Sequence, residues 1–296
     1  SMLNLAPAEG SLSTVKRQSE LVVVARRLAK NPSAVVGFIV ALSLTLMAIF
    51  APLIAPYPYD KQDLYNTRSA PSAEHIFGTD ELGRDIFSRI VYGSRFSLSI
   101  GFLAVLFSSS IGMVLGAIAG YFGGIVDDII MRLIDLIQSI PGILLAITIS
   151  VVLGPGFFNT LLALGFGMIT MACRLTRAAV LGVRHQEYLE AATSINASTP
   201  RIILRHIIPN SFAPVLVSAT MSIGNVIMAA AMLSFIGLGV QPPMPEWGSM
   251  IAGGRSLIRS CPWMVTFPGI FIMLAVLALN LFGDGLRDAL DPKLKK

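Results

Sequence analysis

Residues 34–55 read AVVGFIVALSLTLMAIFAPLIA, a run of 22 residues without a charged side chain. A bilayer core about 30 Å thick is crossed by roughly 20 apolar residues, because each residue of a helix adds about 1.5 Å. A buried helix of a soluble protein would instead present a polar face that repeats every three or four residues, and this run has no such face. The stretch therefore predicts a membrane-spanning helix.

Five further apolar runs follow along the chain, and none of them contains Asp, Glu, Lys, Arg or His. They cover residues 96–126, 136–153, 157–173, 211–238 and 264–282. Over the whole chain 54% of the residues are hydrophobic and 13% are charged, whereas soluble domains carry about 25% charged residues. We therefore predict an all-α integral membrane protein with six transmembrane helices.

The basic residues predict the orientation of the chain. Fifteen of the 22 Lys and Arg residues fall in the two tails and in the segments that lie on the same side as the tails, and seven fall on the opposite side. Because basic residues concentrate on the cytoplasmic side, both termini are predicted to be cytoplasmic. The predicted parts are a tail (1–33), a first span (34–56), an outer loop (57–95), a five-helix core (96–283) with a cytoplasmic loop (184–209) and an outer loop (239–263), and a C-terminal tail (284–296).

The chain contains no recognisable source of energy or catalysis. Its spans lack the ionisable residues that ion-coupled carriers commonly use, although such a carrier can bind sodium through carbonyls and hydroxyls. A Gly-Lys-Ser/Thr phosphate loop is absent, so a pump would need another chain to hydrolyse ATP. His75, His185 and His206 lack the spacing of a metal pair. We predict no catalytic residue, metal site or cofactor in this chain.

The cytoplasmic loop 184–209 reads RHQEYLEAATSINASTPRIILRHIIP and predicts a helix, a turn and a second helix. The first helix is expected to end near Asn196, which suits a left-handed C-terminal position. Thr199 is the expected N-cap, followed by Pro200 at the first helical position. The second helix is expected to end before Pro209.

The second helix of this loop is predicted to be amphipathic. Isoleucines form an apolar stripe and arginines occupy another face, the residues being Ile202, Ile203, Ile207, Ile208, Arg201 and Arg205. Such a helix pair can be a knob gripped by another protein or an ordinary hairpin on the membrane surface. The loop is tied to spans at both ends, which disfavours a DNA-binding helix-turn-helix.

Two long outer loops carry charge and proline. Residues 78–89 (GTDELGRDIFSR) predict a short helix capped by Thr79 or Asp80, with acids in its first turn. Residues 241–247 (QPPMPEW) are too rich in proline for a helix and predict a stiff elbow. Trp247 and Trp263 are expected at the membrane interface, where tryptophan is enriched.

The cytoplasmic loop resembles the EAA loop of ABC importer permeases. The matching residues are Glu190, Ala191, Ala192, Asn196, His206 and Pro209. Asn196 stands where that family has glycine, and it preserves the turn conformation. Residues 78–89, 120–124, 241–248 and 283–292 are similar to the peptide and nickel permease group, and specifically to its C-type subunit. The resemblance extends over nearly everything from residue 31 onward.

The resemblance implies the fold and the partners. It implies a type I ABC importer permease fold in a bacterial or archaeal plasma membrane. The implied partners are a second, B-type six-span permease, two ATPase subunits that hold ATP and Mg, and an extracytoplasmic solute-binding protein. No nucleic acid is implied.

The resemblance also implies roles for particular residues. The loop 184–209 is expected to be the coupling loop, which contacts an ATPase. Its expected coupling residues are Glu190, Ala191, Ala192, Asn196, Arg201, His206 and Pro209. Candidates for docking the binding protein are Asp80, Arg84, Asp85, Arg89, Pro243, Glu246 and Trp247, although the charged ones can equally hold their own loop together. Asn225 and Ser222 are candidates for the translocation pathway.

The expected cargo is a dipeptide or an oligopeptide. Glutathione and nickel systems share these motifs and are the alternatives. A secondary carrier and a membrane scaffold are interpretations of a different class. Dependence of uptake on ATP separates the importer from a carrier, and any uptake separates it from a scaffold.

Overall fold

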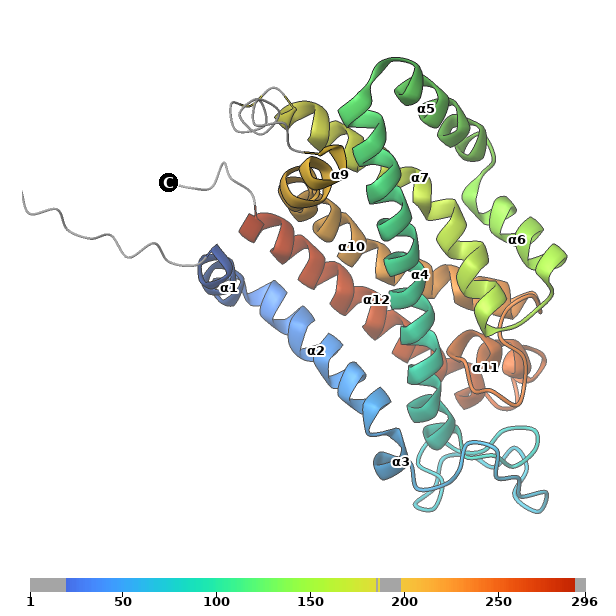
Figure 1. Ribbon diagram of the computed structural model, residues 1–296. Coiled ribbons are helices and arrows are strands. Elements are labelled where there is room, and N and C mark those ends of the chain that lie inside the picture. Colours follow the sequence, from blue (N-terminus) through green and yellow to red (C-terminus); the bar gives the residue numbers. More distant parts are fainter. Residues whose placement is uncertain (1–19, 185, 187–197, 291–296) are drawn as a thin grey trace, which may run out of the picture.

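The computed structural model describes residues 20–184, 186 and 198–290 (Figure 1). The predicted coupling residues Glu190, Ala191, Ala192 and Asn196 lie outside the described residues. The helices are α1 (Glu20–Lys30), α2 (Pro32–Ile49), α3 (Ala51–Ile54), α4 (Ile86–Phe122), α5 (Gly124–Gln138), α6 (Gly142–Leu153), α7 (Phe157–Val183), α9 (Thr199–Ile202), α10 (Ile208–Phe235), α11 (Trp247–Gly254) and α12 (Trp263–Leu290). A π-helical turn, η1 (Ile203–Ile207), and a 3₁₀ turn, η2 (Arg255–Leu257), complete them. The described part of the chain contains no strand, which confirms the all-α prediction.

Six spans are obtained only if a bent pair of helices counts as one. Helices α2, α4, α7, α10 and α12 are each long and apolar enough to cross a bilayer, and α5 with α6 forms a pair bent by 85°. The sequence predicted one continuous helix over residues 136–153, and this was wrong. The chain breaks before Pro141, because the residue preceding a proline is disfavoured in helical conformation. Helix α6 has 12 residues, or about 18 Å.

A seam of small residues joins α4 to α7. Gly112, Gly116 and Gly120 occur at every fourth position of α4 and face α7. A Cβ atom on Gly116 would lie 2.3 Å from the backbone oxygen of Cys173. Membrane helices associate closely where small residues let their backbones approach. These glycines therefore place the two helices in direct backbone contact.

Helix α4 begins at Ile86, ten residues before the predicted span 96–126, and is much longer than a bilayer is thick. Its N-cap is Asp85, whose carboxylate accepts the Ser88 N–H at 2.7 Å. The short helix expected over residues 78–89 was wrong, because Gly83 has φ +70° and the Asp80 carboxylate closes a turn with the N–H groups of Leu82 and Arg84. From Ile86 onward α4 continues for 37 residues, or about 55 Å.

Helices α9, η1 and α10 form one uninterrupted path from the cytoplasmic loop into a span. The helix expected to end before Pro209 instead continues through it, and its N-cap is Ser198 rather than Thr199. In η1 the Ile208 N–H bonds to the Ile203 oxygen, five residues back. Pro209, which has no N–H to donate, follows this π-helical turn as the second residue of α10. The loop is thus joined to α10 without a break.

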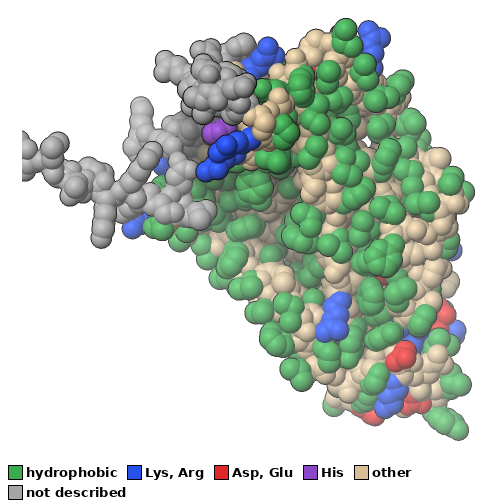
Figure 2. Space-filling view, in the orientation of Figure 1, with side chains coloured by type: hydrophobic (Ala, Val, Ile, Leu, Met, Phe, Trp, Pro, Cys, Tyr) green, Lys and Arg blue, Asp and Glu red, His purple; other side chains and the backbone are tan. Residues whose placement is uncertain are grey.

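The exterior has the polarity of a membrane protein. Figure 2 shows hydrophobic side chains over the middle of the visible face, while Lys, Arg, Asp and Glu gather toward its two ends. In Figure 1 helix α1, helix α9 and the end of α12 lie toward one end, and the loop before α4 lies with α11 at the other. The placement of both termini in the cytoplasm stays a prediction.

Candidate functional site

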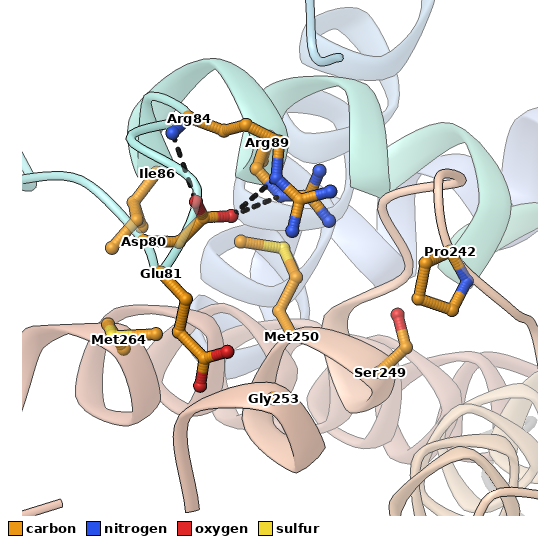
Figure 3. A pocket seen from close by; sticks show the side chains of 10 residues that line it. All are labelled: Asp80, Glu81, Arg84, Ile86, Arg89, Pro242, Ser249, Met250, Gly253 and Met264. Atoms are coloured by element: carbon orange, nitrogen blue, oxygen red, sulfur yellow. Dashed lines mark hydrogen bonds and ion pairs between the residues drawn. The ribbon is translucent and has the colours of Figure 1, made fainter. Parts of the chain in front are cut away.

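A charged pocket lies between the loop before α4 and helices α11 and α12, at the end of the bundle that is predicted to face outward. Figure 3 shows the side chains of Arg84 and Arg89 converging on Asp80. The Arg84 Nε donates to Asp80 Oδ2 at 2.7 Å, and the Arg89 Nε lies 3.6 Å from the same oxygen. Arg89 is 4% exposed and also donates to the Tyr59 backbone oxygen at 3.1 Å. The charges of this pocket are thus largely satisfied within its own wall.

Asp85 is a second buried anchor of the same loop. Its carboxylate accepts the Ser88 N–H and hydroxyl and lies 2.9 Å from His75 Nδ1. In the same loop the Asn66 amide and the Tyr65 N–H lower the pKa of the Asp63 carboxyl below its usual value. These polar bonds hold the loop in shape together with Phe77, which packs against an apolar cluster and stacks on the Phe267 ring of α12.

Helix α11 is fixed to α4 by the predicted elbow. Glu246 is buried and caps α11 by accepting the N–H groups of Gly248 and Ser249 at 2.9 and 2.8 Å. Trp247 is fully buried, and its indole N–H donates to the Ile90 oxygen at 3.0 Å. The expected place of Trp247 at the membrane interface was therefore wrong. Ser97, which donates to Glu246 at 3.3 Å, was missed from the sequence because a lone serine in an apolar run carries no signal.

The predicted docking residues differ in their accessibility. Pro243 is exposed and Arg84 is partly exposed. The others are buried, namely Asp80, Asp85, Arg89, Glu246 and Trp247. Docking of a partner at these residues stays a prediction. The structure shows instead that the buried ones contact other parts of this chain.

We predict that Asp80→Ala loosens the outer loop. The substitution leaves the buried Arg89 guanidinium without its carboxylate, and breaking a buried pair in this way costs about 3–5 kcal/mol. Limited proteolysis of the purified protein should cut within residues 57–85 at least tenfold faster than in the wild type. Asp60→Ala is the matched control because Asp60 is exposed in the same loop. Equal cleavage rates in the two variants would contradict the role of Asp80.

The end of the bundle that is predicted to be cytoplasmic contains the seat of the predicted coupling loop. Ile202 and Ile207 are 2% and 0% exposed and pack against Ala117 of α4 and Val180 of α7. Ile203 and Ile208 pack against the same cluster, which confirms the predicted apolar stripe. Arg201, Arg205 and Pro209 are exposed, and His206 is partly buried. The part of the loop that follows residue 197 is thereby held at the junction of α4, α7 and α10.

Two ion pairs near this seat join α5 to α7. Arg177 donates to both carboxylate oxygens of Asp127 at 2.5 Å, and Arg174 donates to Asp135. Sequence reasoning missed these pairs because about 40 to 50 residues separate the partners. The available signal in the sequence was spacing. Asp127 and Asp135 lie about two turns apart on α5, and Arg174 and Arg177 lie about one turn apart on α7.

The pathway candidates lie on α10. Asn225 is exposed, and the Ser222 hydroxyl donates to the Ser218 oxygen at 2.8 Å. Among the described residues no group of three or more His, Cys, Asp and Glu side chains is placed to hold a metal. The described residues thus form an apolar helix bundle with a charged pocket at one end and the seat of the predicted coupling loop at the other.

Two known protein families match the sequence of this chain. Residues 112–296 match the family described as the binding-protein-dependent transport system inner membrane component. The chain belongs to this family. Residues 19–71 also match the N-terminal transmembrane domain of oligopeptide transport permease C. The resemblance to ABC importer permeases of the peptide group is therefore confirmed.

Individual relatives cover nearly the whole permease. The dipeptide transport system permease protein DppC of Alkalihalophilus pseudofirmus is 49% identical over 91% of this chain and 89% of its own length. The oligopeptide permease OppC of Bacillus subtilis is 42% identical over 91% and 88%. The glutathione permease GsiD of Escherichia coli is 45% identical over 91% and 89%.

A solved structure shares the permease fold. The inward-facing MetNI methionine ABC transporter aligns with a TM-score of 0.54 and 17% identity. The alignment covers 70% of this chain and 98% of that one. This likeness confirms the predicted type I ABC importer permease fold.

Proposed function

We propose that this chain is the permease subunit of an ATP-driven importer and forms half of a translocation pathway for dipeptides or oligopeptides. A solute-binding protein would deliver the cargo, and a second six-span permease would supply the other half of the pathway. Two ATPase subunits would bind at the cytoplasmic end and hold ATP and Mg. The proposed location is the inner membrane.

The observation that carries this proposal is the cytoplasmic seat. Ile202 and Ile207 fasten the end of the coupling loop to α4 and α7, and η1 continues into α10. A force on the loop is therefore transmitted to three spans at once. Closure of the ATPases around ATP would shift the spans from an inward-facing to an outward-facing state, because ATP binds one state of the assembly more tightly than the other.

Selection of cargo is assigned to the binding protein. The uncharged runs predicted as spans offer no charged side chain that would hold a peptide tightly. Asn225 is an exposed polar group on α10. Relatives named for dipeptides and oligopeptides support peptides as cargo. A relative named for glutathione, itself a small peptide, supports the alternative.

The assembly is tested by a pull-down in mild detergent from the native host, followed by mass spectrometry and an ATPase assay. We expect a second six-span protein and one or two ATPases in the eluate, with ATP hydrolysis. Reconstituted vesicles should then take up a labelled dipeptide only with ATP and the binding protein. Recovery of the chain alone, without ATP hydrolysis in several detergents, would contradict the proposal and favour a carrier or a scaffold.

We predict that Arg84→Glu weakens docking of the binding protein. Arg84 lines the outer pocket beside the exposed Glu81, so a charge reversal there changes the electrostatic surface that a partner meets. Affinity for the binding protein, measured by surface plasmon resonance on the reconstituted complex, should fall about tenfold, which corresponds to about 1.4 kcal/mol. Lys61→Glu is the control for a charge change elsewhere in the loop. Unchanged affinity in Arg84→Glu would remove Arg84 from the docking surface.

A further inference from the structure

A groove on the membrane face of the chain runs between α2 and α4. It consists of two adjoining cavities of about 600 and about 110 Å³, and both are lined by Thr45, Leu98 and Phe102. The larger cavity is open to the surface of the chain. The smaller one reaches Ile223 of α10 and Leu279 of α12 beneath α2 and α4. The walls are almost wholly apolar.

One cation stands at the end of this groove. Arg95 of α4 lines the larger cavity, and its Nε and Nη2 donate to the backbone oxygens of Ala48 and Ile49 at 2.6 and 2.8 Å. Its guanidinium also lies 5.8 Å from the centre of the Tyr92 ring. A guanidinium has five N–H donors, so these two bonds leave others for a ligand. The backbone bonds also fix the direction in which the guanidinium points.

The position of Arg95 along α4 corresponds to the edge of the hydrocarbon layer. It immediately precedes the uncharged run 96–126, and α2 ends at Ile49, next to the guanidinium. From Ile49 back to Ala41 the groove follows eight residues of α2, or about 12 Å. One leaflet of a bilayer core is about 15 Å thick. The groove therefore extends over most of one leaflet, with its cation at headgroup level.

We infer that this groove is a binding site for one phospholipid, with an acyl chain between α2 and α4 and the lipid phosphate on Arg95. The anionic phosphate complements the guanidinium, and the hydrocarbon chain complements the apolar walls. Ile49 and Phe102, which line the site, are 58% and 55% exposed in this chain. Both therefore have surface available to a lipid chain.

The shape of the inner cavity favours an acyl chain over a helix of a partner subunit. A helix with its side chains is about 10–12 Å wide. Such a helix could not reach Ile223 or Leu279 unless α2 moved away from α4, and Arg95 ties the end of α2 to α4. A single hydrocarbon chain is narrow enough to enter. A peptide cargo would place polar groups against walls that offer them few partners.

The test counts phospholipids that stay bound to the purified complex. The complex is washed in a delipidating detergent, and retained lipids are counted by native mass spectrometry, which needs neither ATP hydrolysis nor uptake. Ser99→Leu places a bulkier side chain in the larger cavity, which Ser99 lines, and so obstructs the path of an acyl chain. Ser110→Leu is the matched control, because Ser110 is exposed on the same helix and lies outside both cavities. We expect one retained phospholipid in the wild type and in Ser110→Leu, and at least a tenfold lower occupancy in Ser99→Leu.

A second variant tests the headgroup contact. Arg95→Gln removes the charge and keeps N–H donors for the end of α2, so occupancy by the phospholipid should fall while the complex stays assembled. Three results would overturn the inference: no retained phospholipid in the wild type, equal occupancy in Ser99→Leu and Ser110→Leu, or efficient disulfide cross-linking of Ser99→Cys to a cysteine placed in a span of the partner permease. The last result would show that a protein helix occupies the groove.

Discussion

Glu190→Lys is expected to abolish ATP-dependent uptake while leaving the chain inserted in the membrane. Glu190 occupies the acidic position of the EAA motif, where it would meet a basic side chain of an ATPase. Loss of one partner from a buried charge pair at an interface costs about 2–5 kcal/mol. Docking of the ATPase should therefore weaken by at least thirtyfold, since 1.4 kcal/mol corresponds to about a factor of ten. Uptake of a labelled dipeptide should fall to the level seen without ATP.

A matched variant separates this effect from a general effect of charge. Glu187→Lys makes the same change three residues earlier in the sequence of the same loop and outside the motif. It should retain most of the uptake. Insertion of both variants is checked by the amount of the chain in washed membranes. Normal uptake by Glu190→Lys at normal membrane levels would show that this residue does not couple the ATPase to transport.

Gly116→Ala is expected to cause a large loss of stability for the addition of a single methyl group in a span. The added Cβ would lie 2.3 Å from the Cys173 oxygen and 2.8 Å from the Thr176 Cβ, so α4 and α7 must separate. Overpacking of this kind usually costs about 1–3 kcal/mol, and contact with backbone leaves little room for relief. The melting temperature in mild detergent should fall by several degrees, with a lower yield of monodisperse protein.

Gly269→Ala is the control for this substitution. A Cβ at Gly269 of α12 would meet no atom within 4 Å, so only the helix propensity changes. Alanine is favoured over glycine in a helix by about 1 kcal/mol. The melting temperature of Gly269→Ala should stay level or rise. If the two variants melted at the same temperature, the α4–α7 seam would not be the close backbone contact described above.

The apolar runs predicted the membrane class and most spans because a helix of about 20 residues without any charge has no polar face to turn toward water. The isoleucine stripe at 202–208 was predicted for a similar reason, since helical periodicity is visible in a short window. The break before Pro141 was missed because residues 136–153 are uncharged on both sides of it. Composition alone does not distinguish one span from two shorter helices that meet at 85°.

The outer loop was harder to predict because its shape depends on contacts between distant residues. Asp80, Asp85 and Arg89 are charged and fall in the predicted outer loop 57–95, which suggests an accessible surface. Their burial follows from the Tyr59 oxygen, from His75 and from α11, none of which a local pattern connects to them. Trp247 is buried for the same reason, because its partner Ile90 lies 157 positions away. Such pairings are fixed by tertiary packing.

Helix α4 has a mechanical consequence that follows from its length. Its first turn is capped by Asp85 in the outer loop, and Ala117 near its other end touches the seat of the coupling loop. The helix is about 55 Å long in a bilayer core of about 30 Å. A helix of this length that is packed closely against α7 carries a tilt from one of its ends to the other. We therefore expect a tilt of α4 that begins at the seat of the coupling loop to displace the outer loop as well.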